Sequence, residues 1–169
     1  FRWLYWKKKV LEKLKPLLED SSVKKIGQNI KFDFIVLYNQ GITMSTLEDT
    51  MLMSYVLDAG KNRHNMDTLS EIHLNHKTIS FKDLVGSGKK EINFSQVELN
   101  KAMEYAAEDA DITYRLYKIF NKNLKLEKLT NIYEMFEKPM IEILAFMEIN
   151  GIKIDKKILE NLSKKFERK

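Results

Sequence analysis

Acidic residues are concentrated in one short segment of a chain that is basic overall. The chain carries a formal net charge of +5, yet residues 105–111 read Tyr-Ala-Ala-Glu-Asp-Ala-Asp. A further aspartate, Asp33, ends the segment Gly-Gln-Asn-Ile-Lys-Phe-Asp at residues 27–33. Carboxylate oxygens are the ligands that Mg²⁺ and Mn²⁺ prefer. The two segments therefore indicate a divalent-cation site, provided that the fold brings them together.

The spacing within the acidic segment decides which side chains can act together on a helix. At 3.6 residues per turn, Tyr105 and Asp109 share one face, whereas Glu108 and Asp111 point elsewhere. Asp109 also flanks a predicted apolar stripe. The stripe consists of Leu99, Met103, Ala106, Ala110, Leu116, Tyr117 and Phe120. A carboxylate beside a buried stripe is costly unless a cation or a hydrogen-bond donor meets it. The same holds for Asp33 on a short predicted helix, so both aspartates are candidate metal ligands.

Each of these residues also has a purely structural interpretation. An aspartate near the first turn of a helix, such as Asp33, complements the helix dipole. Acidic residues on a surface helix are usually just solvated. Asn29 is most simply a helix cap, and Tyr105 taken alone is most simply a partly buried packing residue. The metal interpretation therefore depends on the residues acting as a group.

The sequence pattern predicts helices with little strand. A β-leaning run at residues 23–27 is the best strand candidate, and Asn29 occupies the N-cap position of a helix that should end at Gly41. Pro16 predicts an interruption or early end of the first helix, and Ser95 should cap a long one. Other helices are expected at residues 8–19, 48–58, 66–76, 95–121 and 131–150, with a basic helix at the end of the chain.

Composition narrows the class of protein. The chain has 169 residues, 44% hydrophobic and 31% charged, as expected for a globular domain. It has no cysteine, which excludes disulfides and thiolate chemistry. We expect a soluble cytoplasmic protein with no membrane partner, because no apolar run is long enough to cross a bilayer. The pI of about 9.2 suits a polyanionic partner, although lysine also fills solvated helix faces.

Residues 27–33 and 105–111 resemble the second and third exonuclease motifs of the bacterial family-A DNA polymerases, the DNA polymerase I family. Further segments occur in the order and spacing of that family, so that the resemblance covers residues 9–169. These segments are residues 14–20, 49–52, 64–69, 76–79 and 150–155. Only the aromatic opening of the chain has no counterpart.

The resemblance implies a proofreading 3′-5′ exonuclease domain with an RNase H-like α/β fold. This domain would occupy residues 1–124, and residues 125–169 would be the first helices of the polymerase domain. In that family four carboxylates hold two divalent metals, and hydrolysis removes the last nucleotide of a single-stranded DNA 3′ end. Polymerase activity is not expected, because the palm motifs would lie beyond Lys169.

The resemblance also assigns roles by position. Asp33 and Asp109 match two of the four metal-binding carboxylates, with Mg²⁺ or Mn²⁺ as the cofactor. Tyr105 matches the tyrosine that orients the attacking water. Asn29 matches a residue of the substrate groove, and Gln28 beside it is a further candidate for contact with nucleic acid.

One motif of the family is missing from the sequence. Its first motif, Asp-x-Glu on the opening strand, should lie upstream of Leu14, but the chain contains no Asp-x-Glu. We therefore expect an N-terminally truncated fold in which the strand at residues 23–27 keeps an open edge and some helix faces are uncovered. Two carboxylates are too few for a two-metal site, so the chain should hold Mg²⁺ weakly and cut poorly.

Three functions remain open. The chain is part of an active exonuclease whose first motif lies elsewhere, with the missing remainder of the polymerase as its partner. Alternatively it is a catalytically dead nucleic-acid-binding or scaffolding remnant, or a decayed fragment. Because residue 1 is phenylalanine rather than methionine, we expect the chain to begin inside a longer one.

Two other sequence patterns are weaker candidates for a functional site. The segment Gly86-Ser-Gly-Lys-Lys is not a phosphate-binding Walker A loop, because Lys90 stands where serine or threonine is required. Lys89 and Lys90 are instead expected on a flexible loop near DNA. His73 and His76 lack a suitable third ligand for zinc, so they are expected to be ordinary exposed histidines.

Overall fold

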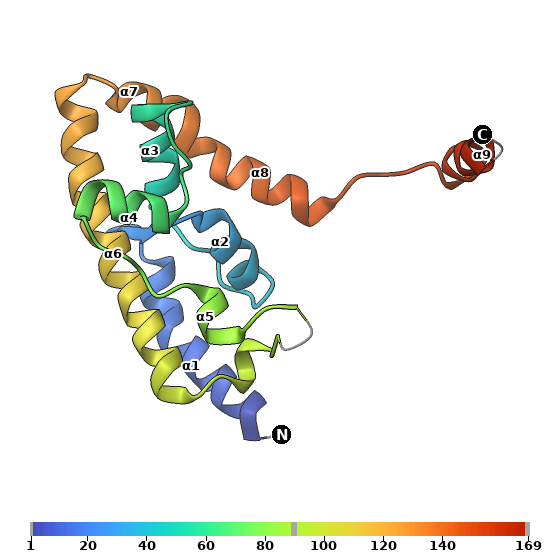
Figure 1. Cartoon of the computed structure of the whole chain (residues 1–169), viewed down its shortest axis with the longest axis horizontal. Coiled ribbons are helices and arrows are strands. Elements are labelled where there is room, and N and C mark those ends of the chain that lie inside the picture. The colour runs from blue at the N-terminus through green and yellow to red at the C-terminus, as the bar shows by residue number, and fades with distance from the viewer. Residues whose placement is uncertain (1, 89–90, 168–169) are drawn as a thin grey trace.

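Helices dominate a computed structural model that describes residues 2–88 and 91–167 (Figure 1). The helices are α1 (Arg2–Glu19), α2 (Ile30–Tyr38), α3 (Thr50–Asp58), α4 (Met66–Leu74), α5 (Phe81–Val85), α6 (Leu99–Leu126), α7 (Thr130–Ile132), α8 (Lys138–Asn150) and α9 (Lys156–Glu167). A 3₁₀ turn, η2 (Phe94–Gln96), precedes α6, and a π-helical turn, η3 (Tyr133–Glu137), precedes α8. The mostly helical organisation predicted from the sequence is confirmed.

Two short strands form the sheet of the described structure. Strand β1 (Lys25–Gly27) pairs in parallel with β2 (Leu47–Asp49), with Lys25 opposite Leu47 and Gly27 opposite Asp49. Helix α2 lies in the connection between them, as a parallel pair requires a crossover. Among the described residues β1 pairs with β2 alone, so its other edge carries no strand. Strand β2 is buried along its whole length.

Two apolar clusters hold the helices together, and the chain after α6 contributes to both. The first cluster consists of Met53, Leu69, Ile112, Leu116, Phe120, Leu124 and Tyr133, from α3, α4, α6 and η3. The second consists of Ile30, Phe34, Met44, Leu47, Ile141 and Ala145, and it joins α2 and β2 to α8. Residues 130–150 therefore pack on the body formed by the preceding chain, across the predicted boundary at residue 124.

Several predicted element boundaries differ from the structure, among them the start of the first helix at Arg2 and the end of the long helix at Leu126. Pro16 lies inside α1, which continues for three residues beyond it to Glu19. Glu48 and Asp49, expected in a helix, belong to β2 because they pair with β1 in the buried sheet. Helix α6 begins at Leu99 rather than at Ser95, because the side chain of Asn93 caps the short η2 turn instead.

The predicted apolar stripe of α6 is buried only in its C-terminal half. Leu99 and Met103 are 81% and 61% exposed, whereas Leu116 and Phe120 are almost fully buried. Ile112, which the predicted stripe did not include, is also buried. The core elements α3 and α4 pack along the later turns of this helix. The turns that carry the acidic segment therefore project beyond the core.

The last helix stands apart from the body. Residues 151–155 have no regular structure and lead away from the body to α9 (Figure 1). Every described residue of α9 is exposed. Within residues 2–88 and 91–167, no helix is long and apolar enough to span a bilayer.

A buried polar network ties the C-terminal segment to the sheet. Glu48 on β2 is 2% exposed, and its carboxylate accepts hydrogen bonds from Lys138 at 3.0 Å, Lys24 at 3.2 Å and the Tyr133 hydroxyl at 3.1 Å. The same hydroxyl accepts the backbone N–H of Asp49 at 3.0 Å. Burial raises the pKa of Tyr133, so the hydroxyl remains neutral and can act as both donor and acceptor.

Removing this hydroxyl should destabilise the fold. Tyr133→Phe leaves the Glu48 carboxylate and the Asp49 N–H each without one buried partner, at a cost of about 1–3 kcal/mol. Urea unfolding should show a lower midpoint for this variant. Tyr55→Phe is the matched control, because Tyr55 is 46% exposed and keeps its ring contact with His64. Equal midpoints for the two variants would contradict the role of the network.

Candidate active site

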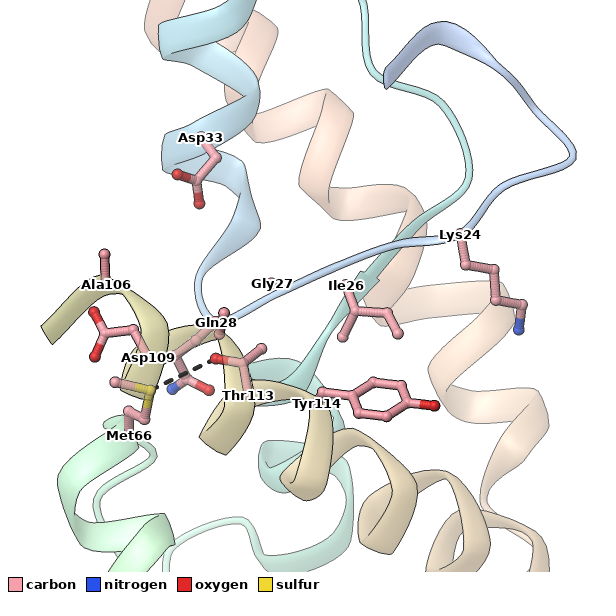
Figure 2. A pocket seen from close by; sticks show the side chains of 11 residues that line it. Lys24, Ile26, Gly27, Gln28, Asp33, Met66, Ala106, Asp109, Thr113 and Tyr114 are labelled. Carbon is pink, nitrogen blue, oxygen red and sulfur yellow. Dashed lines mark hydrogen bonds between the residues drawn. The ribbon is translucent and has the colours of Figure 1, made fainter. Parts of the chain in front are cut away.

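A pocket of about 590 Å³ opens beside β1, between α2 and α6 (Figure 2). It is lined by Lys24, Ile26, Gly27, Gln28, Asp33, Met66, Ala106, Asp109, Ala110, Thr113 and Tyr114. In Figure 2, Asp33 and Asp109 lie toward one end of the pocket, and Lys24 and Tyr114 lie toward the other. The pocket therefore brings together residues from the two acidic segments that the sequence singled out.

Asp33 enters the pocket from the first turn of α2. The crossover from β1 to β2 places this turn at the end of β1, where Gly27 and Gln28 line the pocket. Although Asp33 is accessible to solvent, the atoms around its carboxyl remove enough water to raise its pKa above the ordinary value. A nearby cation would lower the pKa again, because it favours the charged form.

Asp109 enters the pocket from the opposite side, on α6. Its Oδ1 atom is buried and makes no hydrogen bond within the described structure. Burial raises the pKa of Asp109, and the negative charges of Glu108 and Asp67 add to the rise, whereas the Tyr105 hydroxyl lowers it. A buried carboxylate oxygen without a partner is costly, and a divalent cation is one group that would satisfy it.

Two aspartates facing one pocket fit a hard divalent cation as part of its ligand set. Protein carboxylates commonly bind Mg²⁺ through one or two oxygens, with water and substrate phosphate completing the coordination. Within residues 2–88 and 91–167, no three His, Cys, Asp or Glu side chains converge in a way that could hold a metal ion. The chain therefore supplies two candidate ligands at this site, Asp33 and Asp109.

Tyr105 lies one turn before Asp109 on α6 and is half-buried. Burial raises the pKa of Tyr105 to about 12, with the negative charge of Asp109 as the second cause. Its ring lies 6.1 Å from that of Phe81 and 6.2 Å from that of Phe94, which stack on each other at 5.9 Å. The hydroxyl thus borders the acidic end of the pocket, while the ring belongs to an aromatic cluster.

The other residues predicted to contact nucleic acid do not all lie at this pocket. Gln28 lines the pocket, and its side chain donates to the carbonyl of His64 at 2.7 Å. Asn29 lies on a separate pocket beside α8, so the structure does not bring it together with Asp33 and Asp109. Lys89 and Lys90 lie outside the described residues.

Asn29 occupies the N-cap position of α2, as predicted, but its side chain does not cap the helix. Its backbone is left-handed, with φ 57° and ψ 48°, and its side chain makes no cap hydrogen bond. The cap comes instead from Asp49, which is distant in sequence. A residue in the left-handed region cannot take the extended conformation that an N-cap side chain requires.

Sequence reasoning missed several pocket residues. Lys24 lines the pocket, and its Nζ also lies 3.3 Å from the Tyr117 hydroxyl. Met66 and Thr113 meet across the pocket wall, with the threonine hydroxyl 3.6 Å from the sulfur (Figure 2). Thr113 falls on the same face of α6 as Asp109, so its position could have been inferred from the helical spacing.

Glu108 has a structural role that the sequence did not reveal. Its carboxylate accepts hydrogen bonds from His76 Nε2 at 2.7 Å and from the backbone N–H of Ile79 at 2.7 Å. His73 packs edge-on against Phe120, with ring centroids 4.9 Å apart. The two histidines are therefore packing and hydrogen-bonding residues rather than freely exposed ones, and Glu108 fastens the segment after α4 to α6.

The fold and this site match a known class of protein. A family model described as 3′-5′ exonuclease matches residues 4–125, and the chain belongs to that family. Members of the family act on nucleic acid and generally use divalent metals. The matched range contains both acidic segments and the residues that line the pocket.

The relatives of the chain are DNA polymerases. It is 48% identical over 153 residues to DNA polymerase I of Rhizobium leguminosarum, covering 90% of this chain and 15% of that protein. It is 42% identical over 154 residues to DNA polymerase I of Pseudomonas aeruginosa, covering 89% of this chain and 17% of that protein. The chain thus contains the 3′-5′ exonuclease domain of a DNA polymerase I-like protein and spans about one sixth of the length of these relatives.

A solved structure shares the fold. Brucella melitensis NrnC bound to pGG superimposes with a TM-score of 0.64 at 23% sequence identity, over 82% of this chain and 65% of that one. The predicted RNase H-like exonuclease fold is confirmed by this likeness together with the family match.

Loss of the Glu108 carboxylate should release the segment that it fastens. In Glu108→Ala the Ile79 N–H and His76 lose their acceptor, so the amide of Ile79 should exchange with solvent faster. Hydrogen exchange followed by mass spectrometry or NMR would measure this change. Glu104→Ala, one turn earlier on the same helix and exposed, is the control. Unchanged exchange at Ile79 in Glu108→Ala would show that other contacts hold the segment.

Proposed function

We propose that this site is the proofreading centre of the exonuclease domain, which removes nucleotides from the 3′ end of single-stranded DNA. The observation that carries the proposal is the unpartnered Oδ1 of Asp109 in the pocket that Asp33 also lines. Mg²⁺ or Mn²⁺ would be held by Asp33 and Asp109. When bound, such cations activate water and stabilise the negative charge that develops on the phosphate and the departing 3′ oxygen.

Tyr105 would position the attacking water. With a pKa of about 12, its hydroxyl keeps its proton near neutral pH, so it acts as a hydrogen-bond donor or acceptor rather than as a base. It lies one helical turn from Asp109, which places it beside one of the two metal-binding carboxylates.

The aromatic cluster beside Tyr105 supports a single-stranded substrate. Phe81 and Phe94 are 48% and 40% exposed and stack on each other at the edge of α6. Exposed aromatic rings bind unpaired bases by stacking, without sequence preference. Lys24 in the pocket is proposed to contact the phosphate backbone, and Gln28 is proposed to contact the substrate in the same pocket. For Lys89, Lys90 and Asn29, contact with nucleic acid remains a proposal from the sequence.

The site needs carboxylates that this sequence does not contain. We propose that an Asp-x-Glu segment from the remainder of the polymerase supplies them by pairing with the free edge of β1, next to the pocket. Helix α1 presents an apolar face for such a segment, because Val10, Leu14 and Leu17 are 51%, 44% and 54% exposed. In this arrangement residues 1–124 belong to the exonuclease domain and residues 125–169 begin the polymerase domain.

A second candidate function is nucleic-acid binding without cleavage. It is favoured by the convergence of only two candidate ligands in the described pocket. A chain that retains the fold and the aromatic cluster could still hold single-stranded DNA.

We predict that the 169-residue polypeptide shows no Mg²⁺-dependent trimming of a labelled single-stranded 3′ end above background. The physical reason is the shortage of oxygen ligands for two cations. The assay compares the unaltered chain with Asp109→Ala and with Asp111→Ala, an exposed aspartate on the same helix that pairs with Arg115. Trimming that Asp109→Ala abolishes and Asp111→Ala preserves would overturn the account of the missing ligands.

Binding should be measurable separately from cleavage. We predict salt-dependent binding of a fluorescent single-stranded oligonucleotide, followed by anisotropy, because lysines that meet phosphates release counterions. Phe81→Ala should weaken binding at every salt concentration, since one stacking ring is lost. Ile72→Ala, an exposed apolar residue on α4, is the control. Absence of salt-dependent binding would contradict the second candidate function and the proposed role of the aromatic cluster.

A further inference from the structure

The carboxylate of Asp49 connects the end of β2 to the starts of α2 and α3. Asp49 ends β2 and is 1% exposed. Its Oδ1 accepts the backbone N–H groups of Asn29 at 3.0 Å and of Met51 at 2.8 Å, and its Oδ2 accepts that of Ile30 at 2.9 Å. One side chain therefore fixes the first turn of α2 against the first turn of α3.

The turn that Asp49 holds is the wall of the pocket. Gly27 and Gln28, just before Asn29, line the pocket. A Cβ atom at Gly27 would lie 2.8 Å from the Cβ of Ile30, so the turn is closely packed and excludes a larger residue. The Thr50 hydroxyl, next to Asp49, lies within hydrogen-bond distance of the Gly27 carbonyl and of the Gln28 side chain.

Asp33 lies three residues after Ile30, whose backbone N–H donates to the Asp49 carboxylate. Ile30 begins α2, and Asp33 lies in the same first turn, so the orientation of this turn sets the direction of the Asp33 side chain. The left-handed backbone of Asn29 has no side-chain cap of its own. The free N–H groups at this helix end are met by Asp49.

Asp49 does not touch the pocket where chemistry would occur. It lies on the other side of the β1–α2 turn, where it lines a separate pocket beside α8. Its own N–H donates to the hydroxyl of Tyr133, which belongs to the segment after α6. The backbone of Asp49 is thus held from the C-terminal side, and its carboxylate reaches the pocket only through the β1–α2 turn.

We propose that Asp49 is a positioning residue of the exonuclease site, which orients Asp33 toward Asp109 by holding the β1–α2 turn with both of its carboxylate oxygens. This inference rests on the proposed function, because it assigns to Asp33 a metal-binding role. Both oxygens are required. An asparagine offers one acceptor oxygen and presents an NH₂ group to the remaining N–H groups, with which it cannot bond.

The test uses the full chain, labelled with ¹⁵N, and the variant Asp49→Asn. The first measurement is amide exchange, which should rise by about tenfold or more at Asn29 and Ile30, since these N–H groups lose their acceptor. The second is the paramagnetic broadening of amide signals by Mn²⁺. In the unaltered protein Mn²⁺ should broaden signals near both Asp33 and Asp109. In Asp49→Asn the broadening near Asp109 should persist, while that near Asp33 should fall several-fold.

Two control variants separate positioning from loss of stability. Leu124→Ala opens the core on α6 far along the helix from the pocket and should raise exchange broadly without changing the ratio of Mn²⁺ broadening at the two aspartates. Asp155→Asn makes the same side-chain change at the start of α9, where one oxygen of Asp155 accepts the N–H groups of Lys157 and Ile158, and it should leave the pocket unchanged.

The outcomes distinguish this inference from the proposed function. An unchanged ratio of Mn²⁺ broadening in Asp49→Asn, or exchange at Asn29 and Ile30 no faster than in Leu124→Ala, would overturn the positioning role. Absence of broadening at both aspartates in the unaltered protein would overturn the metal site. In that case the amide shifts of residues 31–34 decide: a change specific to Asp49→Asn supports positioning of Asp33, and unchanged shifts contradict it.

Discussion

The parallel pairing of β1 with β2 is the constraint on which the site depends. A parallel pair needs a crossover, and the crossover places α2 directly after the end of β1. The first turn of α2 then lies opposite α6, and Asp33 and Asp109 line the same pocket although they are far apart in sequence. Three paired residues on each strand are few, so the pairing relies on the buried side chains of Glu48 and Asp49 to fasten it to its surroundings.

The sequence was sufficient to predict the longer helices, the strand β1 and the family, because these follow from local spacing and from two short motifs. It did not predict the short helix α5. Its prediction of Asp33 and Asp109 as a pair agrees with the shared pocket.

The role of Asp49 could not be predicted, since a carboxylate that ends a buried strand and caps a helix twenty residues earlier leaves no local pattern. Strand β2 was missed for a related reason: its Glu48 and Asp49 are charged, and they are buried only because Tyr133, two lysines and backbone N–H groups meet them. The exposure of Leu99 and Met103 depends on which elements cover α6, and spacing along one helix does not contain that information.

The segment after α6 is more than a connection to the next part of the protein. Tyr133 in the π-helical turn reaches the sheet, and Ile141 and Ala145 of α8 complete the cluster around α2. π-Helical turns are rare and often occur at functional positions, because the wider turn redirects a side chain. Here the turn directs a tyrosine hydroxyl to the residue that caps α2. The first part of the polymerase domain in this proposal is therefore packed into the exonuclease body, and the two domains share a set of buried hydrogen bonds.

Helix α6 gives this arrangement a mechanical consequence. It is continuous over 28 residues, its buried half is fixed in the first core cluster, and its exposed half carries Asp109. Asp109 lies 15 residues before Leu124, or about 22 Å along the axis at 1.5 Å per residue. A rigid rod of that length is a lever. Because ligand geometry must hold to about 0.5 Å, the tilt of the helix has to be fixed to within about 1°, and the buried side chains of Ile112, Leu116, Phe120 and Leu124 fix it together. The precision of the acidic end is thus set by a row of apolar side chains that begins at Ile112, about one turn after Asp109.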